Sequence, residues 1–185
     1  MEGTALQRFE QLVVQHQRDM VNFHYRFVGD RYQAEDLAQD TFLKAYKKFH
    51  TLNEFEKAKS WLMAIARNVV IDFYRRNKDK TIALDETLTI SHPQSTTIDH
   101  TEDIGHAELG RQLSRCIDQL VKEDRAIVRL LYYEGFTYQE IGDLLGINQN
   151  TLKSRLHRAR KVLLRVIQSD KALVDVAMEY GMSKT

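Results

Sequence analysis

Near the end of the chain lies a stretch whose side chains are suited to reading double-stranded DNA. Between Leu144 and Ser169 there is no Asp or Glu, while Lys and Arg recur at a density that suits a phosphate backbone. Short polar side chains that can hydrogen-bond base edges stand among these cations. The predicted major-groove contacts are Gln149, Asn150, Lys153, Ser154 and His157, and the predicted phosphate contacts are Arg155, Arg158, Arg160 and Lys161.

A helix–turn–helix would hold these side chains in place. Thr137 and Glu140 have the spacing of a capping box, which starts the first helix. Gly142 allows a second helix to cross closely, Gly146 can take the positive φ that ends the first helix, and Asn148 can cap the second. The weaker alternative is a solvated helical hairpin without a ligand. The expected buried stripes are Ile141, Leu144 and Leu145, then Leu152, Leu156, Ala159 and Leu163.

A second candidate surface for nucleic acid lies on the predicted helix of residues 60–76, which a loop of residues 51–59 precedes. Rings and cations side by side suit single strands, because unpaired bases stack on rings while phosphates meet cations. The alternative, that Trp61 anchors the core and the arginines only add solubility, remains open from the pattern. The inward residues should be Leu62, Ile65, Ala66, Val69 and Phe73. The outward residues should be Trp61, Ala64, Arg67, Asn68 and Arg75, followed by Arg76 and Lys78.

The helix predicted at residues 34–49 has an acidic outer face with one leucine in it. Composition does not decide whether this face is a docking surface or ordinary wet helix. Before this helix, residues 9–27 should form one helix or a bent pair, and Asp30 with Gln33 offers a cap. The predicted inward stripe is Ala34, Leu37, Ala38, Thr41, Phe42, Ala45, Tyr46 and Phe49. The outer face is Asp36, Gln39, Asp40, Leu43 and Lys47.

Composition favours an all-α protein. The 185 residues include one Pro and eight Gly, 43% are hydrophobic, and long segments follow the helical period. The net charge of +1 hides a segregation, since Thr81–Gly110 carries −6 and the rest of the chain +7. The acidic connector contains the one Pro and should be flexible.

No catalytic or metal-binding pattern emerges. There is no nucleophile–base arrangement, phosphate loop or metal cluster, so we predict a protein that is not an enzyme and needs no cofactor and no metal. Cys116 should be a buried apolar thiol, and His92, His100 and His106 match no metal-ligand spacing. No apolar run could cross a bilayer and no signal peptide is visible, which predicts a cytoplasmic protein without membrane insertion.

Three motifs in this order resemble a bacterial RNA polymerase sigma factor of the extracytoplasmic-function (ECF) type, over nearly all of residues 5–168. They are AEDLAQDTFLKAYKKF, WLMAIARNVVIDFYRR and, after the connector, YQEIGDLLGINQNTLKSRLHRAR. The resemblance implies a sigma2-like domain at residues 1–78, a flexible acidic linker at 79–104, a sigma4-like helix–turn–helix domain at 105–168 and a tail at 169–185. The tail should pack on the second domain or contact a regulator. The chain departs from the family at Val121, where many relatives have Pro. It also departs in the second helix of the helix–turn–helix, which starts with Asn148-Gln149-Asn150.

The same resemblance implies partners and roles: core RNA polymerase, promoter DNA and an anti-sigma factor that holds the protein inactive. Asp36, Gln39, Asp40 and Leu43 would dock on the β′ clamp helices. The −10 element would be recognised and held open by Asn53, Phe55, Lys57, Lys59, Trp61, Ala64, Arg67, Asn68, Arg75 and Arg76. The −35 element would be read by Asn148, Gln149, Asn150, Thr151, Lys153, Ser154, Arg155, His157, Arg158 and Lys161.

A free-standing helix-turn-helix regulator is the alternative interpretation. Its amino-terminal helices would only dimerise or sense a ligand. Such a regulator has no use for a second nucleic-acid surface, so the helix at residues 60–76 argues against it.

Overall fold

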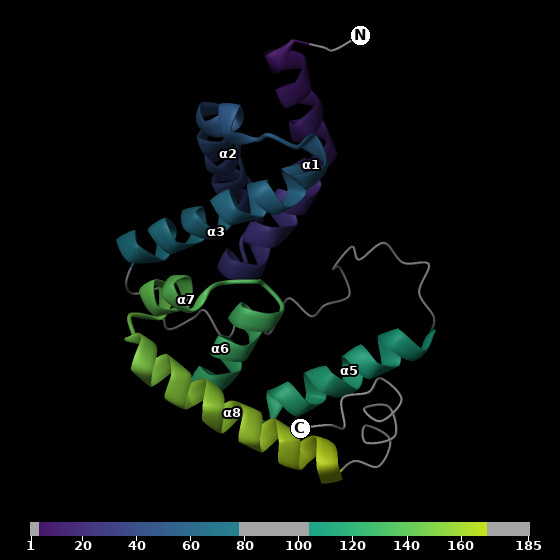
Figure 1. The fold of residues 1–185 in the computed structure, drawn as a ribbon, viewed down its shortest axis with the longest axis vertical. Coiled ribbons are helices and arrows are strands. Elements are labelled where there is room, and N and C mark those ends of the chain that lie inside the picture. The colour runs from purple at the N-terminus through teal and green to yellow at the C-terminus, as the bar shows by residue number, and fades with distance from the viewer. Residues whose placement is uncertain (1–3, 78–103, 170–185) are drawn as a thin grey trace. The chain divides into compact units, whose positions relative to one another are not determined.

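The described residues of the computed structural model, 4–77 and 104–169, are helices joined by short connections (Figure 1). They contain no strand, which confirms the predicted all-α class. The chain divides into two compact units, the first chiefly residues 1–92 and the second chiefly 93–185. Residues 78–103, which include most of the predicted linker, and the tail from residue 170 lie outside the described ranges.

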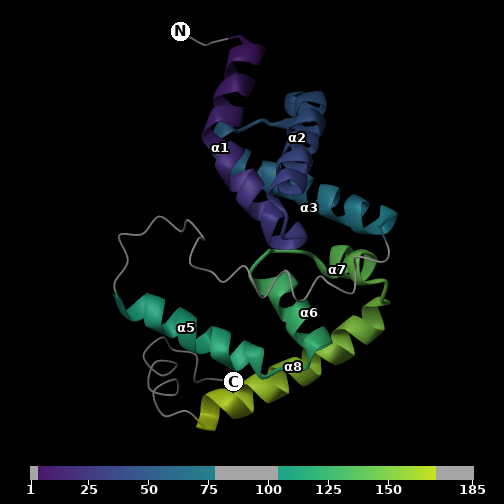
Figure 2. The ribbon, with the colours of Figure 1, turned by 180° about the vertical axis from the view of Figure 1, so that it is seen from behind.

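The first unit is built from α1 (Ala5–Val28), α2 (Arg31–Lys48) and α3 (Ala58–Arg76), with short 3₁₀ turns η1 (Phe49–Thr51) and η2 (Phe55–Lys57). Residues 9–27 therefore belong to a single helix. It ends at Gly29, whose φ of 67° suits glycine. The side chain of Asp30 accepts a hydrogen bond from the Gln33 amide at 2.8 Å, which confirms the predicted cap of α2. α3 packs against both α1 and α2 (Figure 2).

The core of this unit is apolar except for Thr41 and the imidazoles of His16 and His24. Its fully buried side chains include Leu12, Met20, Phe23, Phe27 and Leu62. Four residues of the predicted inward stripes are not fully buried, namely Phe42, Tyr46, Phe49 and Phe73. Tyr46 is 56% exposed, because it lies at the edge of α2 where its ring meets the edge of Phe9. Phe73 is half-buried, and Tyr74 is the buried residue at the end of α3. The Tyr74 hydroxyl donates to the Phe27 carbonyl at 2.5 Å.

Of the two buried imidazoles, that of His24 is fully enclosed. Its Nε2 lies 2.8 Å from the Thr41 hydroxyl oxygen, and that hydroxyl donates to the Leu37 carbonyl at 2.9 Å. The hydroxyl therefore accepts from His24, which puts the imidazole proton on Nε2. Among the described residues, the buried Nδ1 has no hydrogen-bond partner. Burial, aided by the charge of Arg26, lowers the pKa of His24 to about 3.

The second unit contains α5 (Ile104–Asp118), α6 (Lys122–Tyr132), α7 (Tyr138–Leu145) and α8 (Gln149–Ser169). α5 and α6 both pack against α8. Cys116 is a buried thiol, as predicted. Leu152, Leu156 and Ala159 form the buried stripe of α8, whereas Leu163 is only half-buried.

Candidate nucleic-acid interfaces

The turn between α7 and α8 is fixed by its own backbone and by two caps. Thr137 and Glu140 form the predicted capping box, with the Thr137 amide 2.7 Å from the Glu140 carboxylate and the Glu140 amide 3.3 Å from the Thr137 hydroxyl. The Asn148 side chain accepts from the Thr151 amide at 2.8 Å and caps α8. Gly146 has the expected positive φ of 65°.

Gly142 is needed for a reason that differs from the prediction. A Cβ at this position would lie 2.9 Å from the Ile147 carbonyl oxygen, closer than a carbon can approach. The close approach is therefore made by the backbone of the turn and not by a crossing helix. The Ile147 amide also donates to the Gly142 carbonyl at 3.1 Å. These contacts set the direction in which α8 leaves the turn.

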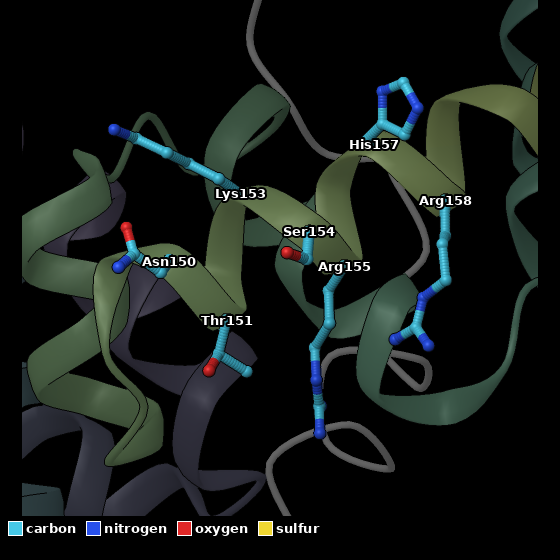
Figure 3. Close-up of a pocket in the computed structure, with 7 residues that line it drawn as sticks. All are labelled: Asn150, Thr151, Lys153, Ser154, Arg155, His157 and Arg158. Atoms are coloured by element: carbon cyan, nitrogen blue, oxygen red, sulfur yellow. The ribbon is translucent and has the colours of Figure 1, made fainter.

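The outer face of α8 carries polar and basic residues, which line a shallow open hollow (Figure 3). Lys153 and His157 point to one side of the helix, and Arg155 and Arg158 point to the other. Ser154 lies between the two rows, as helical periodicity requires. Seven of the predicted −35 residues line the hollow: Asn150, Thr151, Lys153, Ser154, Arg155, His157 and Arg158.

Three side chains at this face have partners on other helices. The guanidinium of Arg160, a predicted phosphate contact, donates to the Tyr132 hydroxyl at 2.7 Å, and this hydrogen bond raises the pKa of Arg160. Arg158 lies 3.6 Å from Asp124 of α6. The Gln149 side chain donates to Gln139 of α7 at 2.8 Å.

Gln139 was absent from the predicted site. Its place near the start of α7 was the only signal in the sequence that could have suggested it. Its contact with Gln149 ties the two helices of the hairpin together beside the reading face. Lys161, the remaining predicted contact beyond Arg158, is exposed.

Trp61 on α3 is half-buried, so its ring is neither enclosed in the core nor fully exposed to solvent. Its indole N–H donates to the Thr51 hydroxyl at 3.2 Å, and that hydroxyl donates to the Lys48 carbonyl at 2.7 Å. These bonds link the ring to η1. Along the same face, Ala64 is half-buried and Asn68 is exposed, with its amide donating to the Ala64 carbonyl at 2.9 Å.

Several cations predicted to meet the −10 element are paired with acids. Lys57 lies 2.8 Å from Glu54, Lys59 lies 2.9 Å from Asp19 of α1, and Arg75 lies 3.5 Å from Asp72. Asp72 also accepts from Lys44 at 2.7 Å, and this hydrogen bond lowers the pKa of Asp72. Of the other predicted residues, Asn53 and Arg76 are exposed, and Phe55 and Arg67 are half-buried.

The acidic face of α2 is fully presented to solvent. Asp36, Gln39, Asp40 and Leu43 are all exposed and follow the i, i+3, i+4, i+7 spacing of one helix face. Leu43 is 62% exposed, which makes it a large apolar side chain standing among polar ones. A face of this composition can offer both charge and an apolar anchor to a partner.

Neither a metal cluster nor a membrane-crossing helix occurs within residues 4–77 and 104–169. His92 and His100, considered from the sequence as possible ligands, lie outside these residues.

Comparison with protein families finds two matches, which together cover both units. Residues 12–80 match the Sigma-70 region 2 model, and residues 110–163 match the Sigma-70, region 4 model. The first matched segment contains α2 and α3, and the second contains α7 and α8 as far as residue 163.

Among curated proteins, the chain is similar to ECF RNA polymerase sigma factors. It is 33% identical to SigE of Mycolicibacterium smegmatis over 166 residues, which cover 88% of this chain and 62% of that protein. It is 32% identical to SigL of Mycobacterium tuberculosis over 156 residues, which cover 83% of this chain and 85% of SigL. SigW of Bacillus subtilis is 31% identical, with coverage of 78% and 80%. The chain therefore spans most of SigL but less than two thirds of SigE.

Solved structures with a similar chain include two complexes of a sigma factor. The sigma factor RpoE bound to the anti-sigma factor NepR, from Bartonella quintana, is 24% identical with a TM-score of 0.41, and the match covers 88% of this chain and 98% of that chain. CnrH bound to the cytosolic domain of CnrY is 20% identical with a TM-score of 0.38, with coverage of 90% and 96%.

Proposed function

The chain belongs to the ECF sigma factors of the sigma-70 family, and from this premise we propose that it binds core RNA polymerase and directs it to specific promoters. The observation that carries the proposal is the presence of two chemically different exposed surfaces on separate units of one chain, the polar and basic face of α8 and the Trp61 face of α3. We assign the protein no catalytic residue. It would act in the cytoplasm, where core polymerase and promoter DNA are found.

The second unit would read the −35 element as intact duplex. A major groove admits one helix, and α8 offers a rigid helix whose outer face has small polar side chains flanked by cations. Asn150 and Ser154 run between the basic rows and would face the base edges. Arg155 and Arg158 would reach the phosphates on one side, and Lys153 and His157 would reach base edges on the other.

The first unit would hold the −10 element in its separated form. Single-stranded bases need a ring to stack on, and Trp61 supplies one whose orientation is fixed by the Thr51 hydroxyl. Lys57 and Lys59 precede Trp61 by four and two residues at the start of α3, and Arg75 lies near the other end of the same helix. These cations are paired with carboxylates in the free protein, so DNA phosphates must displace the carboxylates to bind them. Binding is therefore favoured when a base stacks on Trp61 at the same time as the phosphates bind the cations.

The exposed face of α2 would dock on the β′ clamp helices of the polymerase. Its carboxylates would pair with cations of the partner, and Leu43 would enter an apolar site, since an exposed leucine on a polar face is suited to serve as an anchor. An anti-sigma factor would compete for the surfaces that polymerase and promoter use.

Transcription in vitro with core polymerase and genomic promoter DNA tests the proposal. We expect discrete transcripts whose start sites share an upstream pair of motifs, and a matched reaction without the chain should lack them. A protein that yields no promoter-specific transcript, yet binds defined duplex DNA without polymerase, would instead be a free-standing helix-turn-helix regulator.

A further inference from the structure

A buried carboxylate lies behind the reading face of α8. Asp124 is in the first turn of α6, and its side chain is only 7% exposed. Within the described part of the chain, its Oδ1 has no hydrogen-bond partner. The cation that faces this oxygen is Arg158, whose Nη2 lies 3.6 Å away and whose side chain is 65% exposed. One member of the pair is thus enclosed in the domain and the other extends into solvent.

This geometry restrains the arginine and leaves most of it available. A separation of 3.6 Å is an ion pair without a direct hydrogen bond. A carboxylate that water cannot reach has a strong preference for a nearby cation. A guanidinium carries five N–H donors in a planar fork, so one edge can face Asp124 while others remain turned outward. Arg158 also points to the same side of α8 as Arg155 (Figure 3).

We infer that Asp124 is a positioning residue for the −35 contact, in that it fixes the guanidinium of Arg158 in the orientation that meets a DNA phosphate. An arginine otherwise loses considerable rotamer freedom on binding, and a side chain ordered in advance loses less. The inference rests on the proposed function, because it assumes that this face of α8 meets duplex DNA.

Simple electrostatics predicts the opposite effect, which makes the inference testable. A negative charge near a DNA-binding face repels phosphate, so its removal should tighten binding. If Asp124 orients Arg158, its removal should weaken binding although the protein becomes more positive. The sign of the change therefore separates the two explanations.

The experiment uses holoenzyme assembled from core polymerase and the full chain, with a duplex promoter fragment selected from a randomised −35 library. A second fragment with a scrambled −35 element gives the nonspecific affinity. The variants are Asp124→Asn, Arg158→Ala and the two combined. Glu123→Gln is the matched control, because Glu123 is an exposed acid in the same first turn of α6. Thermal unfolding of each variant shows whether its fold is retained.

We expect Asp124→Asn to weaken specific binding roughly threefold to tenfold, in the range of coupling between residues in contact. Glu123→Gln should leave binding unchanged or slightly tighter. In the Arg158→Ala background, Asp124→Asn should change the affinity less than about twofold, because its effect acts through the missing guanidinium. Arg158→Ala itself should lower the slope of log affinity against log salt by about one.

Tighter or unchanged binding by Asp124→Asn would overturn the inference, as would an equal loss with and without Arg158. If Arg158→Ala is silent while Lys153→Ala weakens binding, the inference fails and the −35 role of α8 stands. If both are silent, that role fails as well. If Asp124→Asn does not fold, Arg158→Lys replaces it in the experiment. We expect Arg158→Lys to bind DNA with an affinity close to that of Arg158→Ala, because an ammonium lacks the planar guanidinium that Asp124 would orient. Wild-type affinity of Arg158→Lys would refute the inference.

Discussion

Acidification should destabilise the first unit through His24. In the folded protein the imidazole is enclosed, and its protonated form would place a charge against the unpartnered Nδ1 site in an apolar core. Burial lowers its pKa from 6.5 to about 3. The unfolded chain therefore takes up a proton as the pH falls through 6.5, while the folded chain resists. Stability is complete above pH 6.5 and is lost progressively between 6.5 and 3.

The size of the effect follows from the two pKa values. Between them, each pH unit costs about 1.4 kcal/mol of unfolding free energy. At pH 5 the solution lies about 1.5 units below the unfolded-state pKa, so the first unit should lose about 2 kcal/mol relative to pH 7.5. His16 acts in the same direction, because burial also lowers its pKa.

Urea unfolding at several pH values measures this loss. The single tryptophan, Trp61, belongs to the first unit, so its fluorescence reports that unit alone. In His24→Gln the amide can still donate to Thr41 but cannot take up a proton, so the loss between pH 7.5 and 5 should shrink by about 2 kcal/mol. His50→Gln, at an exposed position, is the matched control and should keep the wild-type pH dependence.

Equal pH slopes for wild type and His24→Gln would refute the reasoning. So would a wild-type protein whose unfolding free energy stays constant from pH 7.5 to 5. Either result would mean that the imidazole is solvated or protonated in the folded state.

Three further predictions concern the turn and the two other surfaces. Gly142→Ala should destabilise the second unit by about 1–3 kcal/mol in circular-dichroism melting, because its Cβ meets the Ile147 carbonyl, whereas Gly110→Ala, in open space, should not. Asp40→Arg should weaken core-polymerase binding at least several-fold in a titration with labelled protein and leave the melting curve intact. Trp61→Ala should slow open-complex formation, followed by permanganate reactivity, more than it weakens closed binding; equal losses would contradict that role.

Local signals in the sequence were sufficient to predict three of the helix boundaries, whereas the start of α1 at Ala5 and the start of α3 at Ala58 were not predicted. The capping box at Thr137, the Asp30 cap and the positive φ of Gly146 each depend on residues within one turn, and all three are confirmed. Burial at the ends of helical stripes was less predictable. Tyr46 and Phe73 continue the period of their helices, but whether a neighbour covers them depends on where the other helices stop.

The sequence predicted which residues share an exposed helix face, but it did not predict which side chains pair between helices. Helical periodicity alone places Asn150 and Ser154 outward and Leu152 inward, as observed. The pairing of Arg158 with Asp124, and of Lys59 with Asp19, joins helices separated by 30 residues or more in sequence. No local pattern reports such contacts, because they arise only when helices pack.

The construction of the α7–α8 hairpin has an evolutionary consequence. Its angle depends on the Gly142 contact with a main-chain atom, on the Asn148 cap and on leucines turned toward the interior, so outward side chains such as Asn150 and Ser154 are not needed to maintain it. Substitutions on the outward side can accumulate with little effect on folding. Descendants of one such protein can therefore acquire different sets of target genes while inheriting the same scaffold.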